Sequence, residues 1–238
     1  MAIIISNFRN HLYNMEQFSR RIFNIESIKA VKFIVDKFIR EVTNGTYKID
    51  DLIIIFDSDD TLVTLDLTLG YHKSIAVSYY AKPKKFNQLE LENLEFALLI
   101  DKVPCEGKTT LEVLDYINIH DVNCLVETSR RLSLLKATFN NFSKNGILER
   151  ILNNKFYLQR DVELDHLTLY TANILLVSDQ PKGIKFRKLC EHIGRKYKII
   201  IIIDDTLSKI TSFFDAFPEK EYIVFGCLYT FINKPKKR

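Results

Sequence analysis

Leu-Ile-Ile-Ile-Phe at residues 52–56 runs directly into Asp-Ser-Asp-Asp-Thr at residues 57–61. The pattern recurs near the other end of the chain, where five isoleucines at residues 199–203 are followed by Asp-Asp-Thr at residues 204–206. Short, unbroken runs of apolar and β-branched residues are typical of strands that are buried on both faces, as in parallel sheets. Ligands of such sheets bind beyond the carboxyl ends of the strands, so both acidic groups are predicted to lie at one edge.

The acidic residues at that edge predict a bound cation. Two buried strands would deliver at least four carboxylates to one edge of the sheet. At about 4 Å, each pair of like charges costs roughly 4 kcal/mol when the effective dielectric constant is near 20. A fold that keeps such an arrangement needs a positive ion, so we expect a metal together with a substrate that requires it.

Predicted strands and helices alternate along most of the chain. Apolar runs indicate further strands at residues 122–126, 174–177 and 222–225, and amphipathic segments indicate helices at residues 26–42, 108–119, 130–143, 182–194 and 206–215. Residues 150–172 are ambiguous, with a short hairpin as one interpretation. The alternation predicts an α/β fold, in which a Rossmann-like parallel sheet is flanked by helices and joined by right-handed crossovers.

Changes in this alternation divide the chain into parts. We expect an N-terminal helical segment at residues 1–50 that packs on the core, an α/β core at residues 51–63 and 105–230, a small helical cap insertion at residues 64–104, and a basic tail at residues 231–238. The insertion carries an aromatic patch followed by an acidic amphipathic helix. Within it, Tyr71, His72, Lys73 and Tyr80 are candidates either for substrate contact or for packing of the insertion.

Composition places the chain among ordinary globular proteins. Hydrophobic residues make up 47% of the chain and charged residues 27%, and the net charge is +4. The C-terminal tail alone carries four basic side chains while the central motifs are acidic, which argues against nucleic-acid binding. No apolar run approaches the roughly 18–20 residues of a membrane span, so none is predicted. No pattern indicates an oligomeric state.

Cysteine usage and the N-terminal sequence bear on location. The four cysteines are widely spaced without a CxxC pair, which predicts buried free thiols and a reducing compartment. The first residues lack a basic leader and an apolar region of signal length, so we expect a cytoplasmic protein. Export as an effector by a specialised secretion system stays open. The histidines form no HExxH pattern, which argues against a zinc hydrolase.

The pair Asp57 and Asp59 suits nucleophilic and acid–base chemistry. Asp57 is the first residue after the predicted strand, and Asp59 can point to the same site once the chain leaves the sheet. One carboxylate could attack while the other protonates a leaving oxygen. A calcium loop of the EF-hand type is excluded, because it requires Asp or Asn and then Gly where Thr61 and Leu62 stand. A helix N-cap would explain either acidic cluster alone but not both together.

Four motifs, in order, resemble those of the haloacid-dehalogenase-like (HAD) superfamily of phosphohydrolases. They are the Asp-x-Asp-x-Thr that starts at Asp57, Thr128 after an apolar run, Lys182 at the start of a helix, and the pair Asp204-Asp205 after a strand. The motifs span residues 52–226. Their Thr-Ser-Arg and Lys-Gly details are most similar to a poorly characterised bacterial branch of that superfamily, whose function is unknown.

The resemblance implies a phosphatase that acts on a phosphorylated substrate through an aspartyl-phosphate. Asp57 would be the nucleophile, and Asp59 would protonate the leaving group and then activate water. Thr128 would bind a phosphoryl oxygen, and Lys182 would neutralise charge between the nucleophile and the phosphate.

The cofactor implied by the resemblance is Mg²⁺. Asp57, Asp204 and Asp205 would hold the ion with their side chains, and Asp59 with its backbone carbonyl. Mg²⁺ prefers a few oxygen ligands and keeps places for waters and for phosphate, so this sparse set of carboxylates suits it. Such an ion would orient the in-line transfer of the phosphoryl group.

Several neighbouring residues are alternatives for these roles. Lys185 lies one helical turn beyond Lys182 and could replace it, and Ser129 could replace Thr128. Glu127 stands where the superfamily usually has an apolar residue, which indicates either an extra polar contact or a register shifted by one. Arg130 could bind phosphate or could face water at the start of a helix.

Other functions compete with phosphate hydrolysis. A signalling receiver domain also surrounds a phosphorylatable Asp with carboxylates, a Thr and a Lys, but its acidic pair lies on the first strand and its Lys comes last. Here Lys182 precedes the final acidic pair, so the order disagrees. A catalytically inactive binding or effector module of the HAD type is a further alternative, which the acid at Asp59 argues against.

Overall fold

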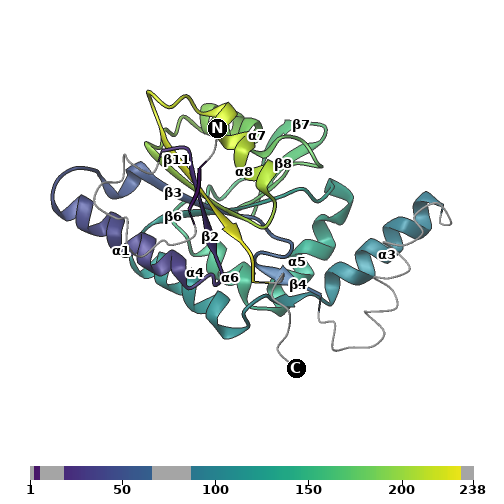
Figure 1. Cartoon of the computed structure of the whole chain (residues 1–238). Helices are drawn as coiled ribbons and strands as arrows, with labels where there is room; N and C mark the ends of the chain where they lie inside the picture. The colour runs from purple at the N-terminus through teal and green to yellow at the C-terminus, as the bar shows by residue number, and fades with distance from the viewer. Residues whose placement is uncertain (1–2, 6–18, 66–86, 232–238) are drawn as a thin grey trace.

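The computed structural model describes residues 3–5, 19–65 and 87–231 (Figure 1). Its central sheet has nine strands among these residues, in the order β1-β2-β11-β10-β3-β6-β9-β8-β7. Every neighbouring pair from β1 to β9 is parallel, and only β8 and β7 extend the sheet in antiparallel fashion. The strands are β1 Ile3–Ile5, β2 Arg21–Ile25, β3 Leu52–Phe56, β6 Asn123–Thr128, β7 Val162–Asp165, β8 Thr168–Thr171, β9 Ile174–Leu176, β10 Ile199–Asp204 and β11 Ile223–Tyr229.

Helices cover both faces of this sheet, as Figure 1 shows. One face packs against α1 Ala30–Thr43, α4 Lys108–Ile119, α5 Leu135–Lys144 and α6 Ile147–Leu152, and the other against α7 Lys182–Ile193 and α8 Leu207–Ala216. In β3, Leu52, Ile54 and Phe56 enter the first layer, while Ile53 and Ile55 enter the second. Burial on both faces explains the unbroken apolar run, and the predicted α/β fold with a parallel sheet is confirmed.

Residues 1–50 were predicted to form a helical segment that packs on the core; the described part contains the helix α1 but also contributes the strands β1 and β2 to the sheet. Residues 21–25 form β2, which pairs in parallel with β11 and with β1. Ile22, Phe23 and Ile25 are buried there. Five residues are too few to show a strand period clearly, and the partner β11 lies about two hundred positions later in the chain.

The described part of the insertion begins and ends in a pair of short strands. β4 Val63–Thr64 and β5 Val103–Pro104 are antiparallel neighbours, and α3 Gln88–Ile100 precedes β5. A reciprocal capping box between Asn87 and Glu90 fixes the start of α3. Figure 1 shows α3 beyond α5, to one side of the sheet. The predicted contact residues Tyr71, His72, Lys73 and Tyr80 lie outside the described residues, as does the tail from residue 232 onward.

Two short connecting helices and a hairpin complete the fold. Ile49–Asp51 and Leu132–Leu134 are 3-10 turns that lead into β3 and α5, respectively. The ambiguous region before β9 contains α6 and the antiparallel pair β7–β8, which agrees with the hairpin interpretation. Within the described ranges, no helix is long and apolar enough to cross a membrane.

Candidate functional site

Three carboxylates meet at the carboxyl edge of the sheet. β10 and β3 are parallel neighbours in which Ile203 pairs with Phe56, so Asp204 and Asp57 come side by side where the two strands end. Asp205 follows directly, and a carboxylate oxygen of each of these three residues lies within 4.8 Å of the others. Asp204 is 1% exposed and Asp57 8%. The structure thus brings together the three side chains that were expected to hold a metal.

Lys182 lies between two of these carboxylates. It is the first residue of α7, and its ammonium group donates to Oδ1 of Asp57 at 2.5 Å and to Oδ2 of Asp204 at 2.7 Å. Burial lowers the pKa of Lys182, but the two carboxylates more than offset this and hold the pKa above its ordinary value. Lys185 instead donates to Asp165 at 2.7 Å. Of the two lysines, the structure therefore places Lys182 in the site.

The carboxylate cluster carries more negative than positive charge. Burial raises the pKa of Asp57, against the opposing effect of Lys182, and it raises the pKa of Asp204 in the same way. Burial and the neighbouring Asp57 raise the pKa of Asp205. Each shift records the cost of holding negative charges together away from water. A divalent cation would offset that repulsion, and an all-oxygen donor set is the kind that Mg²⁺ and Ca²⁺ take.

Glu127 adds another carboxyl group to the same face of the sheet. Val126 on β6 pairs with Phe56 on β3, and Leu125 packs in the layer of α7 and α8, so side-chain alternation turns Glu127 toward that layer. Glu127 is completely buried, and neither side-chain oxygen has a hydrogen-bond partner within the described part of the chain. Burial raises its pKa well above the ordinary value, which favours the neutral acid.

Thr128 ends β6 beside these groups. Its hydroxyl accepts a hydrogen bond from the backbone N–H of Arg130 at 3.3 Å, and its carbonyl accepts one from Val177 at 2.9 Å. Both Thr128 and Glu127 are fully buried, and the pairing of Val126 with β3 shows the register directly. Glu127 is therefore a polar residue within β6, one position before its last residue, Thr128. Ser129 lies just beyond the strand.

The carboxylate of Asp59 is engaged by two basic side chains. Arg130 donates to it through Nε at 2.8 Å and through Nη2 at 2.7 Å, and Lys102 also donates to it. Arg130 is 5% exposed and donates to Oγ1 of Thr138 at 3.0 Å, so it does not face water. Burial raises the pKa of Asp59, but the two cations outweigh burial and hold that pKa well below its ordinary value. Asp59 is therefore ionised at neutral pH.

A cavity of about 360 Å³ opens beside this ion pair. Asp59, Lys102 and Arg130 line it, and so do Leu98 and Leu99 of α3. Arg131 and Ser129 also border the cavity, where Arg131 pairs with Glu95 of α3 through contacts of 2.7 Å. The insertion thus supplies an apolar wall, and the loop after β6 supplies a basic one.

Comparison with known proteins identifies one family. A family described as "Protein of unknown function (DUF2608)" matches residues 24–238. The chain belongs to this family. No curated protein and no solved structure matches it. In this DUF2608 protein, the matched region contains Asp57, Thr128, Lys182 and Asp204, so the site described above is built entirely from the part of the chain that the family shares.

Sequence reasoning missed one of the two basic residues that bind Asp59 in this DUF2608 protein. Lys102 was not singled out, although its side chain binds Asp59 from 43 positions away. It stands alone between the apolar end of α3 and β5, with no motif around it. Only the antiparallel pairing of β4 with β5, which returns the chain to the end of β3, brings Lys102 to Asp59.

Proposed function

We propose that this protein is a Mg²⁺-dependent phosphatase of the HAD type, which transfers the phosphoryl group of a phosphorylated substrate to Asp57 and then to water. The observation that carries the proposal is the cluster of Asp57, Asp204 and Asp205 with Lys182 between two of them, at the carboxyl edge of a parallel sheet. Ligands of such sheets bind at this edge. The order of the four motifs along the chain agrees with the proposal.

Each side chain has a definite task in this reaction. A carboxylate oxygen of Asp57 attacks phosphorus as the bond from phosphorus to the substrate oxygen breaks, and water later attacks the aspartyl-phosphate and releases phosphate. Lys182 offsets the negative charge shared by the nucleophile and the phosphoryl oxygens, and the Thr128 hydroxyl donates to one of those oxygens. Asp57, Asp204 and Asp205 would hold Mg²⁺, which supplies charge neutralisation and orients the phosphate.

Asp59 is the proposed acid and base, and its ion pairs constrain when it can act. An ionised carboxylate can accept a proton from water, but the low pKa makes Asp59 a weak base while Arg130 and Lys102 hold it, so the hydrolysis step also requires these pairs to loosen. Donation of a proton to the leaving group requires that its pairs with Arg130 and Lys102 first open. A substrate in the adjacent cavity would compete for these two cations, which links substrate binding to the protonation of Asp59.

The deciding experiment measures hydrolysis of an aryl phosphate with and without Mg²⁺. We expect turnover that requires the ion and falls at least about a thousandfold in Asp57→Asn, because the amide cannot attack phosphorus. Asp215→Asn is the matched control: it makes the same change at an exposed carboxylate near the C-terminal end of α8, and Asp215 belongs neither to the cluster nor to the lining of the adjacent cavity. Its activity should stay within about twofold of the parent.

The competing functions give different results in the same assay. A receiver domain would be labelled by acetyl phosphate yet barely turn over, and an inactive binding module would show neither labelling nor hydrolysis. Equal turnover in Asp57→Asn and in the unchanged protein would refute the proposed nucleophile.

A further inference from the structure

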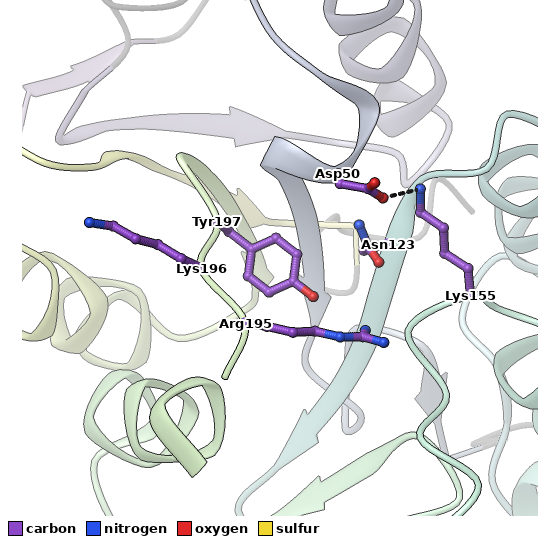
Figure 2. Close-up of a pocket in the computed structure, with 6 residues that line it drawn as sticks. All are labelled: Asp50, Asn123, Lys155, Arg195, Lys196 and Tyr197. Atoms are coloured by element: carbon purple, nitrogen blue, oxygen red, sulfur yellow. Dashed lines mark hydrogen bonds and ion pairs between the residues drawn. The ribbon is translucent and has the colours of Figure 1, made fainter. Parts of the chain in front are cut away.

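The amino edge of the sheet contains a second cavity, opposite the carboxylate cluster. Its volume is about 310 Å³, and Figure 2 shows the six residues that line it. Asn123 begins β6, Asp50 comes from the turn before β3, Lys155 follows α6, and Arg195, Lys196 and Tyr197 form the connection from α7 to β10. Three of the six are cationic and one is anionic.

Arg195 is the cation of this cavity that has no carboxylate partner within the described residues. Its Nη1 donates to the Phe156 carbonyl at 3.3 Å, and its guanidinium lies 5.1 Å from the centre of the Phe156 ring. Gly194, with a φ of +67°, ends α7 in the left-handed conformation that glycine adopts readily, and this turn carries the chain into Arg195. A planar guanidinium held in this way still has donors free for an incoming oxyanion.

Tyr197 supplies a second unused polar group. Its side chain packs between the rings of Phe156 and Phe186, whose centres lie 6.2 and 6.3 Å away. The residue is 4% exposed, and Arg195 acts on its hydroxyl oxygen, but no group among the described residues accepts a hydrogen bond from that hydroxyl. In Figure 2 this hydroxyl lies close to the Arg195 side chain. Because a buried hydroxyl that donates to nothing is unfavourable, a ligand that accepts its hydrogen bond binds more tightly.

Lys155 is a further cation of the cavity, although its ammonium group is already paired with two carboxylates. Its ammonium group binds Asp50 at 2.8 Å and Asp121 at 3.3 Å. Asp50 lines the cavity as well and is the carboxylate with which an anionic ligand would compete. Lys196 pairs with Glu221 at 3.4 Å and is largely exposed, so it contributes only weakly to the positive electrostatic potential around the cavity.

From this arrangement we infer that the cavity binds a phosphate group, either as inorganic phosphate or as the phosphate of a small ester. Arg195, Tyr197 and Lys155 bring two cations and a hydroxyl donor to one cavity, which suits a tetrahedral oxyanion with several acceptor oxygens. A carboxylate has only two oxygens and a single negative charge, so it matches two cations and a hydroxyl donor less well than a phosphate does. The inference does not rest on the proposed phosphatase activity, because none of these residues belongs to the carboxylate cluster.

Calorimetric titration with inorganic phosphate tests this site. The full chain is kept in buffer with EDTA and without divalent ions, so that a metal-loaded cluster cannot contribute. We expect saturable binding of one phosphate, at least about tenfold weaker in Arg195→Gln, where a charged donor is lost. Asp50→Asn should bind about threefold to tenfold more tightly, because a competing carboxylate is removed. Lys108→Gln, a distant change of the same charge on a side chain that is 88% exposed, should bind as the parent does.

Tyr197→Phe keeps the ring packing and removes only the hydroxyl. It therefore tests the site even if Arg195→Gln fails to fold. We expect it to unfold at the same temperature as the parent or higher, yet to bind phosphate about threefold to tenfold more weakly. Unchanged phosphate affinity in either Arg195→Gln or Tyr197→Phe overturns the inference, as does the absence of saturable binding to the parent. Phosphatase activity without phosphate binding in EDTA would count against this site alone.

Discussion

At the scale of single residues, Glu127 is the most unusual group in the structure, because a fully buried carboxyl without a partner favours its neutral form. A raised pKa in the folded state stabilises the protein fully below the unfolded value near 4.5, and this stabilisation is lost as the pH rises toward the folded value. Glu127→Gln mimics the neutral acid. We expect the variant to gain stability over the parent by up to about 1.4 kcal/mol per pH unit above 4.5.

Chemical denaturation at a series of pH values measures this difference. Glu163→Gln on β7, an exposed glutamate, is the matched control and should follow the parent at every pH. A difference between Glu127→Gln and the parent that stays constant from pH 4.5 to 8 would contradict the buried and unpaired state of Glu127.

At the scale of elements, the position of Lys182 depends on the close packing of α7 against α8. A Cβ on Gly183 would lie 2.4 Å from the Ser212 carbonyl oxygen and 2.6 Å from Cα of Phe213. Gly183→Ala would ordinarily gain up to about 1 kcal/mol inside a helix, but here the added atom meets backbone and the two helices must separate. We expect a net loss of about 1–3 kcal/mol in unfolding free energy and a fall in phosphatase activity, because Lys182 moves with α7.

Thermal unfolding and the aryl phosphate assay check this prediction together. Ile184→Ala changes the next residue of α7, whose side chain is 46% exposed, and should alter both quantities little. If Gly183→Ala proved as stable and as active as Ile184→Ala, the contact between the two helices would not position the lysine.

The elements also show how far the sequence alone could lead. The strand at residues 52–56 was predicted with its observed bounds, because burial on both faces leaves an unmistakable apolar run. β2 was missed, since its place in the sheet is set by pairing with β11 rather than by its own pattern. The carboxylates of Asp57 and Asp204 could be brought together by topology, whereas the ion pairs of Asp59 with Arg130 and Lys102 depend on loop paths that no local pattern encodes.

At the scale of the whole molecule, a divalent cation at the carboxylate cluster should stabilise the entire fold, because it binds only where β3 and β10 are assembled. At a Mg²⁺ concentration a hundred times its dissociation constant, the gain is about 2.7 kcal/mol. For a chain of this size, that corresponds to a rise in Tm of about 5–10 °C. Asp204→Asn should abolish the rise and Asp215→Asn should preserve it, as measured by calorimetry at matched ionic strength.

The same measurement can also contradict binding of Mg²⁺ at the carboxylate cluster. If MgCl₂ raised the Tm of Asp204→Asn as much as that of the parent, the ion would bind elsewhere, and the carboxylates at the ends of β3 and β10 would have to be stabilised in another way.

The position of β2 also has a consequence for biosynthesis. A ribosome releases residues 21–25 early, but β2 lies beside β11, which is the last strand of the described residues to emerge. Until residues 223–229 leave the exit tunnel, β2 can pair only with β1 and cannot join the growing sheet. Loop closure over such a span is slow. β1 and β2 are therefore synthesised early but join the sheet late. In a nascent chain that stalls before β11, they would have no strand of the main sheet to pair with.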